Sequence, residues 1–372
     1  MRTNPAVSVL VVVAVVITGI AAAGCLGGGQ SSEKIVYWTT MAPKLQQVAI
    51  ERGDVDGGVS WEPYVSDSIV AGSAKPLLWS GDVWPNHPCC VVAVSRTFAE
   101  SHPDLVMRAL KAHIEANRWI ADALEKKTTD PSNYTMLLEM GAAFSARNIT
   151  VIEASLQHMT LDYKMTQDFY DYLSIFTQKY LDLKILKQTD LTARGYDSIN
   201  DFVTNYVDSS YLTGADSKPK SDVIVGSISM AYLTGDLHQF ARVVATNRTI
   251  FDGTEFEGKN FFEKYGVGIT DPLPGGYAVG GDIMDAFKAG VADMGYLGAP
   301  PTILKHLTAG VNTMIVAQAN SEGSALIVNP TITSIDELEG KTIATPGPSS
   351  IQQLLFLSIA ASNGFTVKLA GT

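Results

Sequence analysis

A loop of small and hydroxyl residues, Thr345-Pro346-Gly347-Pro348-Ser349-Ser350, precedes a segment with helical apolar spacing that ends at Asn363-Gly364. The start of a helix offers free backbone N–H groups and the positive end of the helix dipole, and serine hydroxyls add further donors. Such a loop suits a sulfonate, nitrate, phosphate or carboxylate. The same residues also make a good helix N-cap, so cap chemistry alone leaves both roles open.

Two further loops carry ionisable side chains. Gly235-Asp236-Leu237-His238 follows a predicted strand at Val223–Ser227, and Glu322-Gly323-Ser324 follows another at Met314–Ala317. His238 can contact an anion when protonated or donate a hydrogen bond when neutral, and a structural role fits it equally well. A carboxylate such as Glu322 in a binding cleft indicates a solute that carries an amine or other hydrogen-bond donors.

Aromatic residues accompany a second carboxylate in Trp61-Glu62-Pro63-Tyr64. Trp61 and Tyr64 can stack on a flat solute or cover an alkyl chain. Glu62 repeats the acceptor chemistry of Glu322. Trp61 fits a position in the hydrophobic core equally well, so its role stays open.

The segment Asn86-His87-Pro88-Cys89-Cys90 contains ligand types for soft cations. The residues that follow, Val91 to Val94, predict a buried strand, in which adjacent cysteines would point to opposite faces. A closed zinc site would also need ligands from elsewhere in the chain. We therefore expect no metal, with Asn86 and His87 lining a cleft and the cysteines buried as small apolar residues.

Sequence motifs that are typical of several enzyme classes are incomplete or do not occur in this chain. Gly340-Lys341-Thr342 resembles the end of a phosphate-binding loop, but Ile335 occupies the position of its required first glycine. Gly266-Val267-Gly268-Ile269-Thr270-Asp271 lacks the third glycine of a dinucleotide loop, and neither His-Glu-x-x-His nor Gly-x-Ser-x-Gly occurs. We expect no catalytic residues and no cofactor.

A spacing repeat predicts the elements that position these loops. The segments 48–63 and 285–300 each contain a glycine, Gly53 or Gly290, then an Asp three residues later and a Pro ten residues later. Each copy predicts a helix that ends at glycine, a short buried strand, and a loop at the carboxyl end of that strand. Ligands bind at this end of open α/β sheets. Two such copies facing each other would form a cleft.

Composition and charge narrow the class of protein. With 46% hydrophobic residues and mixed charge, the 372-residue chain is globular, and its formal net charge of −11 argues against nucleic acid binding. Only three cysteines are present, which is too few for a disulfide-built fold.

The N-terminus predicts export. Arg2 precedes an apolar run that ends in Ala21-Ala22-Ala23-Gly24, which indicates a signal peptide over residues 1–24. Small residues directly before Cys25 resemble a lipoprotein processing site, which implies a lipidated Cys25 and a flexible tether over residues 25–33. An uncleaved transmembrane anchor is the alternative, because the run approaches the ~20 residues that a span needs. In both cases we expect an extracytoplasmic protein anchored at the outer face of the cell membrane.

The combination of motifs resembles the solute-binding proteins of ABC importers for nitrate, taurine and aliphatic sulfonates, whose wider family includes thiamine-precursor binders. The motifs are Trp61–Tyr64, Trp84–Cys90, Gly235–Gln239, Gly298–Pro301, Glu322–Leu326 and Ala344–Gln352. In that family the last four stand first and the first two follow. Here the two groups stand in the opposite order. The resemblance extends from about Lys34 to Thr372. We therefore expect a circularly permuted chain, with a fragment of tandem copies as the alternative.

The resemblance implies an α/β fold with two lobes, of the type II periplasmic-binding-protein class. One lobe is expected to be discontinuous, built from residues 34–94 and 335–372. The other is expected to be continuous over 95–334 and to contain a joining linker at 213–221, which is polar and rich in turn residues.

The resemblance also implies a function. A monomeric receptor would capture a small anionic or zwitterionic solute between the lobes and deliver it to ABC permease subunits in the membrane. The expected ligand-binding residues are Gly235, Asp236, His238, Gly298, Ala299, Glu322, Gly323, Ser324, Thr345, Gly347, Ser349, Ser350, Trp61, Glu62, Asn86 and His87. The alternatives are a binder of thiamine-type pyrimidines and a related pyridoxal-phosphate-dependent pyrimidine synthase, whose cysteine-rich motif His87 and Cys89-Cys90 resemble only faintly.

Overall fold

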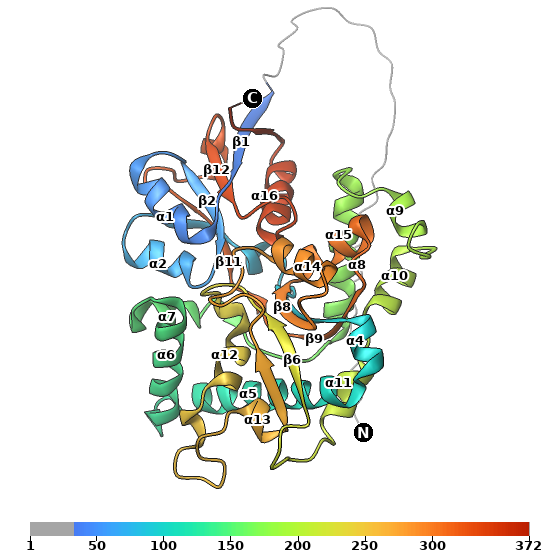
Figure 1. Ribbon diagram of the computed structural model, residues 1–372. Coiled ribbons are helices and arrows are strands. Elements are labelled where there is room, and N and C mark those ends of the chain that lie inside the picture. The colour runs from blue at the N-terminus through green and yellow to red at the C-terminus, as the bar shows by residue number, and fades with distance from the viewer. Residues whose placement is uncertain (1–32, 372) are drawn as a thin grey trace, which may run out of the picture. The chain divides into compact units, whose positions relative to one another are not determined.

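Two sheets organise residues 33–371, the part of the chain that the computed structural model describes (Figure 1). In spatial order, the six-stranded sheet contains β13 (Phe365–Leu369), β1 (Lys34–Thr40), β12 (Thr342–Thr345), β2 (Gly57–Trp61), β11 (Ser324–Val328) and β3 (Lys75–Trp79). The five-stranded sheet contains β7 (Val267–Thr270), β6 (Gly226–Ala231), β8 (Met294–Gly298), β4 (Cys90–Ser95) and β9 (Thr313–Gln318). The expected mixed α/β class is confirmed.

The six-stranded sheet joins the two ends of the described chain. Strand β1 pairs in parallel with both β12 and β13, and Val36 stands opposite Val367 in the register. Strand β2 continues this parallel set beside β12, while β11 runs antiparallel between β2 and β3. The carboxyl ends of β1, β12 and β2 therefore lie at the same edge of the sheet.

The five-stranded sheet has a mixed pattern. Strand β6 runs parallel to β7 and β8, whereas β4 is antiparallel to both of its neighbours, β8 and β9. Residues Cys90 to Val94 of β4 are all buried, as the apolar run predicts. Because β4 is antiparallel to β8, the first residues of β4 lie beside the carboxyl end of β8.

Helices surround both sheets. Those that pack against the six-stranded sheet are α1 (Pro43–Arg52), α2 (Tyr64–Val70), α3 (Ser80–Val83) and α16 (Ile351–Ser362). The remaining helices are α4 (Arg96–Ser101), α5 (Pro103–Glu125), α6 (Pro131–Ser145), α7 (Ile149–Ser155), α8 (Gln167–Asp182), α9 (Gln188–Thr192), α10 (Ile199–Tyr206), α11 (Ser210–Ala215), α12 (Phe240–Thr246), α13 (Phe261–Lys264), α14 (Gly280–Lys288) and α15 (Ala299–Ala309). Among residues 33–371, none is both long and apolar enough to cross a membrane.

The spacing repeat predicts the local structure correctly. Helix α1 ends at Gly53 (φ 75°), and Gly290 (φ 70°) follows the end of α14. Both glycines occupy the left-handed region that terminates helices. Strands β2 and β8 follow them at the expected distance. The two loops of the repeat thus leave the carboxyl ends of strands in different sheets.

Some predicted elements differ from the structure. The strand predicted at Val223–Ser227 begins only at Gly226, because Val223 to Val225 are exposed and precede the paired segment. The sequence pattern of residues 149–160 predicts one helix, but α7 ends at Ser155, since Met159–Thr160 form a short strand, β5, that pairs with β10 (Ser321–Glu322).

Sheet membership also departs from the expected lobe boundaries at two places. Strand β4 belongs to the five-stranded sheet, although residues 90–94 were expected in the discontinuous lobe, and β11 belongs to the six-stranded sheet, although residues 324–328 were expected in the continuous lobe. The chain therefore crosses between the sheets over Ser80–Cys89 and Ala319–Gly323. By contact pattern, the residues from Lys34 onward form a single compact unit. The predicted signal peptide and most of the tether lie outside the described residues.

Candidate functional site

A cavity of about 220 Å³ lies where the loops of the two sheets meet. Thr40 and Trp61 reach it from the ends of β1 and β2, and Gly298 reaches it from the end of β8. Because β4 runs antiparallel to β8, its first residue, Cys90, and the preceding Cys89 also reach the cavity. The full lining is Thr40, Trp61, Cys89, Cys90, Leu233, Asp236, His238, Val279, Gly280, Gly281, Gly298, Pro301, Pro346, Gly347, Pro348, Ser349, Ser350, Ile351 and Gln352.

Three helices begin at the cavity wall. Gly280 opens α14, Gly298 caps α15, and Ser350 caps α16. Helix N-termini carry partial positive charge and favour anions. Lysine and arginine are absent from the lining residues, so these helix ends, together with His238, are the lining features that favour negative charge in a bound solute.

Ser350 is already engaged as a cap. Its hydroxyl oxygen accepts a hydrogen bond of 3.0 Å from Gln353 N and its O–H donates to Gly347 O at 2.8 Å. The adjacent Ser349 is held through its carbonyl, which accepts a bond of 3.3 Å from the Tyr180 hydroxyl. The loop therefore combines cap chemistry with a position on the cavity wall, and both roles that the sequence left open are compatible with it.

His238 lies at the centre of a buried polar network. Its ring nitrogen Nε2 lies 2.9 Å from Gly323 O, and Nδ1 lies 3.2 Å from Cys89 Sγ and 3.5 Å from Asp236 Oδ1. Because a carbonyl oxygen only accepts, Nε2 must carry a hydrogen. Nδ1 therefore faces the thiol of Cys89 and the carboxylate of Asp236.

Charge coupling shifts the pKa values of this network. Burial opposes a charge on His238, but Cys89 and Asp236 raise the pKa of its ring to about 9. Burial likewise opposes a thiolate at Cys89, but a hydrogen bond from Cys90 and the nearby His238 lower the pKa of that thiol well below its usual range. The hydrogen bond to Cys89, together with burial, raises the pKa of the Cys90 thiol instead. These shifts favour a charge on Cys89 and on His238 and a neutral thiol on Cys90.

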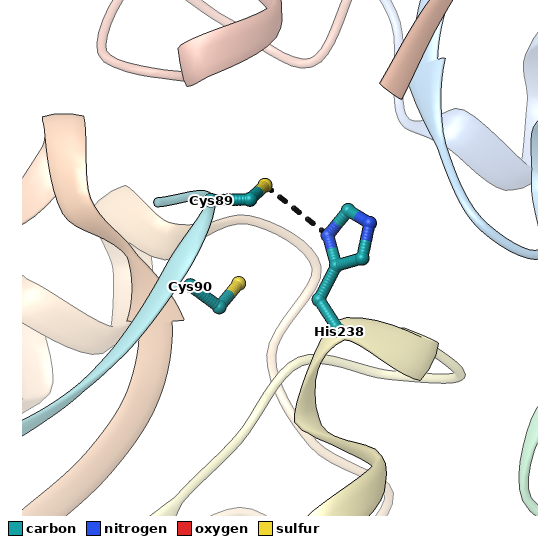
Figure 2. Close-up of side chains that lie close together, drawn as sticks. All are labelled: Cys89, Cys90 and His238. Atoms are coloured by element: carbon teal, nitrogen blue, oxygen red, sulfur yellow. Dashed lines mark hydrogen bonds between the residues drawn. The ribbon is translucent and has the colours of Figure 1, made fainter. Parts of the chain in front are cut away.

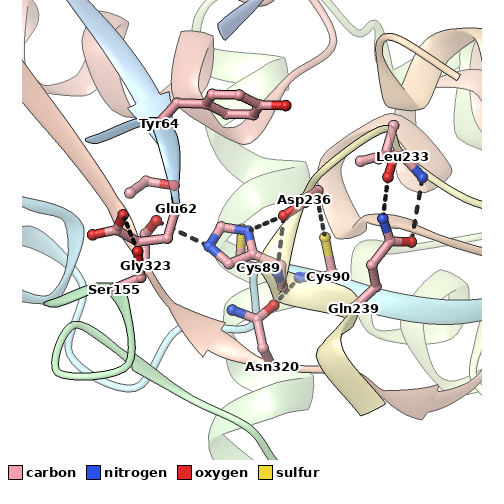
Figure 3. Close-up of polar contacts among 12 residues, drawn as sticks. Glu62, Tyr64, Cys89, Cys90, Ser155, Leu233, Asp236, Gln239, Asn320 and Gly323 are labelled. Atoms are coloured by element: carbon pink, nitrogen blue, oxygen red, sulfur yellow. Dashed lines mark hydrogen bonds and ion pairs between the residues drawn. The ribbon is translucent and has the colours of Figure 1, made fainter. Parts of the chain in front are cut away.

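Asp236 links this pair to the second cysteine. Its Oδ1 accepts a hydrogen bond of 2.9 Å from His238 N, and its Oδ2 lies 3.8 Å from Cys90 Sγ (Figure 3). Burial raises the pKa of Asp236 to about 6, against the opposing influence of His238. A solute in the cavity would therefore meet a carboxyl group and two sulfur atoms beside the imidazole.

The two glutamates expected to receive donors from the solute do not line the cavity. Glu62 is completely buried, and its carboxylate accepts hydrogen bonds from Ser66 N (3.0 Å), Ser66 Oγ (2.8 Å) and Ser155 Oγ (3.0 Å). Burial raises its pKa to about 6. Glu322 Oε1 accepts a bond of 2.7 Å from Asn86 N. Both carboxylates hold neighbouring loops in place.

Of the expected ligand residues, the cavity brings together Trp61, Asp236, His238, Gly298, Gly347, Ser349 and Ser350. The others that were expected lie outside its lining: Gly235, Ala299, Glu322, Gly323, Ser324, Thr345, Glu62, Asn86 and His87. Several of these hold lining residues in position. Gly323 O, for example, accepts a hydrogen bond from His238 Nε2. His87 is fully buried, and its ring packs among Trp84, Tyr172 and Phe176.

The expectation that the cysteines face opposite sides is wrong. Cys89 precedes the first residue of β4, so the alternation of a regular strand does not apply to it. Cys89 Sγ, Cys90 Sγ and a ring nitrogen of His238 all lie within 4.8 Å of one another. Both cysteines line the cavity, although the sequence predicts them only as buried apolar residues, and their ligand chemistry was the signal that pointed to this role.

Comparison with known proteins agrees with the resemblance seen in the sequence. Residues 18–130, less than a third of the chain, match the model of the NMT1-like family. The chain is also similar to the bicarbonate transport ATP-binding protein CmpC of Synechocystis sp., with 27% identity over 90 residues, which are 24% of this chain and 14% of that protein. No solved structure matches the chain. The family match supports a relationship with the substrate-binding proteins of ABC transporters.

Proposed function

We propose that the protein is the solute-binding receptor of an ABC importer and that it captures a small anion or zwitterion in the cavity between the two sheets. The observation that carries this proposal is the convergence of strand ends from both sheets on one cavity. Binding clefts in open α/β folds form at such strand ends. The match with the NMT1-like family supports the same role.

The chemistry of the cavity supports a small charged solute of the nitrate, sulfonate or taurine class. The N-termini of α14, α15 and α16 favour an anionic group, and Asp236 offers a carboxyl group to an amine. Trp61, Leu233 and Val279 supply apolar contacts for a short alkyl chain. The volume of about 220 Å³ is below the ~300–1,000 Å³ that is usual for drug-sized ligands, which favours a compact solute.

Circular permutation is part of the proposal. The parallel pairing of β1 with β13 supports it, because the two ends of the described chain are adjacent strands of one sheet. The segment 213–221 begins within the last turn of α11, leads toward β6, and would be the linker that joins the ancestral ends. A tandem fragment would not require its first and last strands to be neighbours.

Closure around the solute would use the two crossings between the sheets, Ser80–Cys89 and Ala319–Gly323, as hinges. The solute would favour the closed arrangement only through its higher affinity for that state. The permease would then recognise the closed receptor.

Export and anchoring by a lipidated Cys25 place the receptor at the outer face of the membrane, where mature protein should begin at Cys25 with the added mass of lipid. Recovery of an intact chain from Met1 would instead support a helical anchor.

Native mass spectrometry of the purified full chain, followed by thermal-shift titration with nitrate, taurine, an alkanesulfonate, bicarbonate and a thiamine-type pyrimidine, tests the function. We expect one of these solutes to bind without turnover and to stabilise the protein by about 2.7 kcal/mol at a hundredfold excess over its Kd. Gly281→Leu should fill the cavity and abolish this shift, because a side chain at Gly281 points toward Ser349.

Lys288→Ala, at the opposite end of the same helix, serves as the matched control and should retain the shift. Consumption of a solute with release of product would contradict the receptor role. A thermal shift that persists in Gly281→Leu would mean that the solute binds elsewhere in the molecule.

A further inference from the structure

Cys89, Cys90 and His238 form a compact set of soft ligands at the cavity wall (Figure 2). We propose that Cys89 Sγ, Cys90 Sγ and His238 Nδ1 bind a thiophilic cation of the Zn²⁺ or Cu⁺ class, with the remaining coordination position open toward the cavity. Two thiolates and an imidazole suit such cations. Three protein ligands with one open position are the arrangement of zinc sites that bind a further molecule.

The distances fit a small movement on binding. Ligand atoms on a tetrahedral zinc ion lie roughly 3.3–3.8 Å apart, given bonds of about 2.0–2.3 Å. The separation of 3.2 Å between Cys89 Sγ and His238 Nδ1 is already close to this value, and all three ligand atoms lie within 4.8 Å of one another. Movement of the ligand atoms by about one ångström would complete the site.

A backbone contact orients the histidine for this role. His238 Nε2–H donates to Gly323 O at 2.9 Å, and the same carbonyl accepts a bond of 3.0 Å from Glu62 N. The contact places the hydrogen on Nε2 and leaves Nδ1 toward the sulfur atoms. Histidines that bind metals are usually held in this way by a carbonyl or carboxylate on the other nitrogen.

The cysteines are fixed by a second buried residue. Asn320 accepts a hydrogen bond from Cys89 N through its backbone carbonyl (3.1 Å) and one from Cys90 N through its side-chain Oδ1 (2.8 Å). Its own side chain is completely buried. Because both cysteine N–H groups bond to one residue, the backbone that carries the two thiols is held in place.

The charge around the set also favours a cation. Asp236 lies 3.8 Å from Cys90 Sγ and 3.5 Å from His238 Nδ1, and it is completely buried. Lysine and arginine are absent from the residues lining the cavity. Metal binding would displace the protons of both thiols and of His238 Nδ1, and the cation would then offset the negative charge of the two thiolates and of Asp236.

Metal titration of the reduced, full-length chain under anaerobic conditions tests the proposal independently of the transport role. Co²⁺ serves as a spectroscopic probe for Zn²⁺, since thiolate ligands produce sulfur-to-cobalt charge-transfer absorption, and a parallel titration with Cu⁺ against a chromophoric chelator distinguishes the two cations. We expect one ion per chain. Changes to groups that merely orient ligands cost 10–100-fold in metal affinity, so Cys89→Ser, Cys90→Ser and His238→Gln should each weaken binding by about 100-fold or more.

Cys25→Ser is the matched control, because it removes a cysteine outside this set and should leave the stoichiometry and affinity unchanged. Should the ligand variants fail to fold, alkylation of the wild-type protein provides a second measurement. Zn²⁺ or Cu⁺ should protect Cys89 and Cys90 from iodoacetamide. Unchanged metal affinity in all three variants would overturn the proposal, as would thiols that stay equally reactive with metal present. A Cys89–Cys90 disulfide that persists under reducing conditions would also overturn it.

Discussion

The Tyr64 hydroxyl donates a hydrogen bond of 3.0 Å to Thr234 O, although the two residues are 170 positions apart. Tyr64 begins α2 directly after β2 of the six-stranded sheet, and Thr234 lies in the loop after β6 of the five-stranded sheet. The bond therefore ties the two sheets together beside the cavity. If the sheets separate to admit a solute, this contact must break.

Tyr64→Phe should consequently favour the open arrangement. Loss of one hydrogen bond of ordinary strength costs about 1 kcal/mol, so affinity for the selected solute should fall about fivefold. Calorimetry measures the affinity, and small-angle scattering of the empty protein should show a larger radius of gyration. Tyr170→Phe, on α8, is the control. Equal affinity and an unchanged scattering profile would show that the contact does not resist opening.

The two serines before α16 should separate cap chemistry from solute binding. Ser350→Ala removes the hydroxyl that accepts from Gln353 N and should lower the free energy of unfolding by about 1 kcal/mol. Ser349→Ala should leave stability nearly unchanged and weaken solute binding, since Ser349 lines the cavity without capping the helix. Chemical denaturation and calorimetry of both variants provide the comparison. A stability loss in Ser349→Ala equal to that of Ser350→Ala would contradict this division.

Gly323→Ala should disrupt the histidine site. A Cβ at Gly323 would clash with His238 Nε2 and approach Met159 Cβ at 3.0 Å, so the imidazole would have to leave its position. The φ of 83° at Gly323 adds backbone strain of roughly 1–2 kcal/mol for an L-residue. We expect metal affinity to fall together with stability.

Gly340→Ala reproduces the backbone strain of this substitution without the clash. Gly340 has a similar φ of 75°, and a Cβ there would meet nothing within 4 Å. In thermal denaturation this control should lose only the stability that the backbone strain costs, and it should retain the metal affinity of the wild-type protein. Parallel loss of metal affinity in both variants would indicate that strain, not displacement of His238, is responsible.

His113 should make the protein less stable in mild acid. Burial lowers the pKa of its ring to about 4, against the raising effect of its hydrogen bond to Gln318 O. Nε2–H donates to that carbonyl at 2.9 Å, and Nδ1 accepts from the Tyr296 hydroxyl at 3.1 Å. Because the unfolded chain binds the proton near pH 6.5 and the folded chain only near pH 4, the contribution of His113 to stability is intact above pH 6.5 and declines between these values by about 3 kcal/mol.

Urea denaturation at a series of pH values measures this loss. In His113→Gln the loss of stability between pH 6.5 and pH 4 should be smaller by about 3 kcal/mol. A further loss should remain, because burial also lowers the pKa of His306 to about 4. His102→Gln, which alters an exposed side chain, should retain the full decline. An unchanged decline in His113→Gln would exclude this residue as its source.

Much of the fold follows from local sequence patterns. The glycine at the end of a helix and the apolar run after it predict β2 and β8, because left-handed glycine termination and strand burial are local properties. Sequence patterns also predict helices over about 103–124, 132–145 and 166–186, and α5, α6 and α8 agree with these ranges within a few residues, since amphipathic spacing is also local. Seven of the expected ligand residues line the cavity for the same reason: they occupy loops at predicted strand ends or helix starts.

The roles of the charged residues could not be predicted in this way. Glu62 and Glu322 resemble solute acceptors in sequence, yet serine and backbone donors of neighbouring loops occupy their carboxylates. Which donors surround a carboxylate depends on the packing of distant segments, such as α7 against α2. A pattern in one loop contains no information about that packing.

The sequence by itself determined several of the helices and strands, the soft-ligand chemistry of Cys89 and Cys90, and the repeat that presents Trp61 and Gly298 at strand ends. Only the tertiary structure decided that Cys89, Cys90 and His238 are neighbours, across 149 positions between Cys89 and His238. The physical reason is strand direction. Because β4 runs antiparallel to β8, its first residues reach the edge where β8 ends, beside the loop that follows β6. Long-range pairing sets that direction, and no local pattern encodes it.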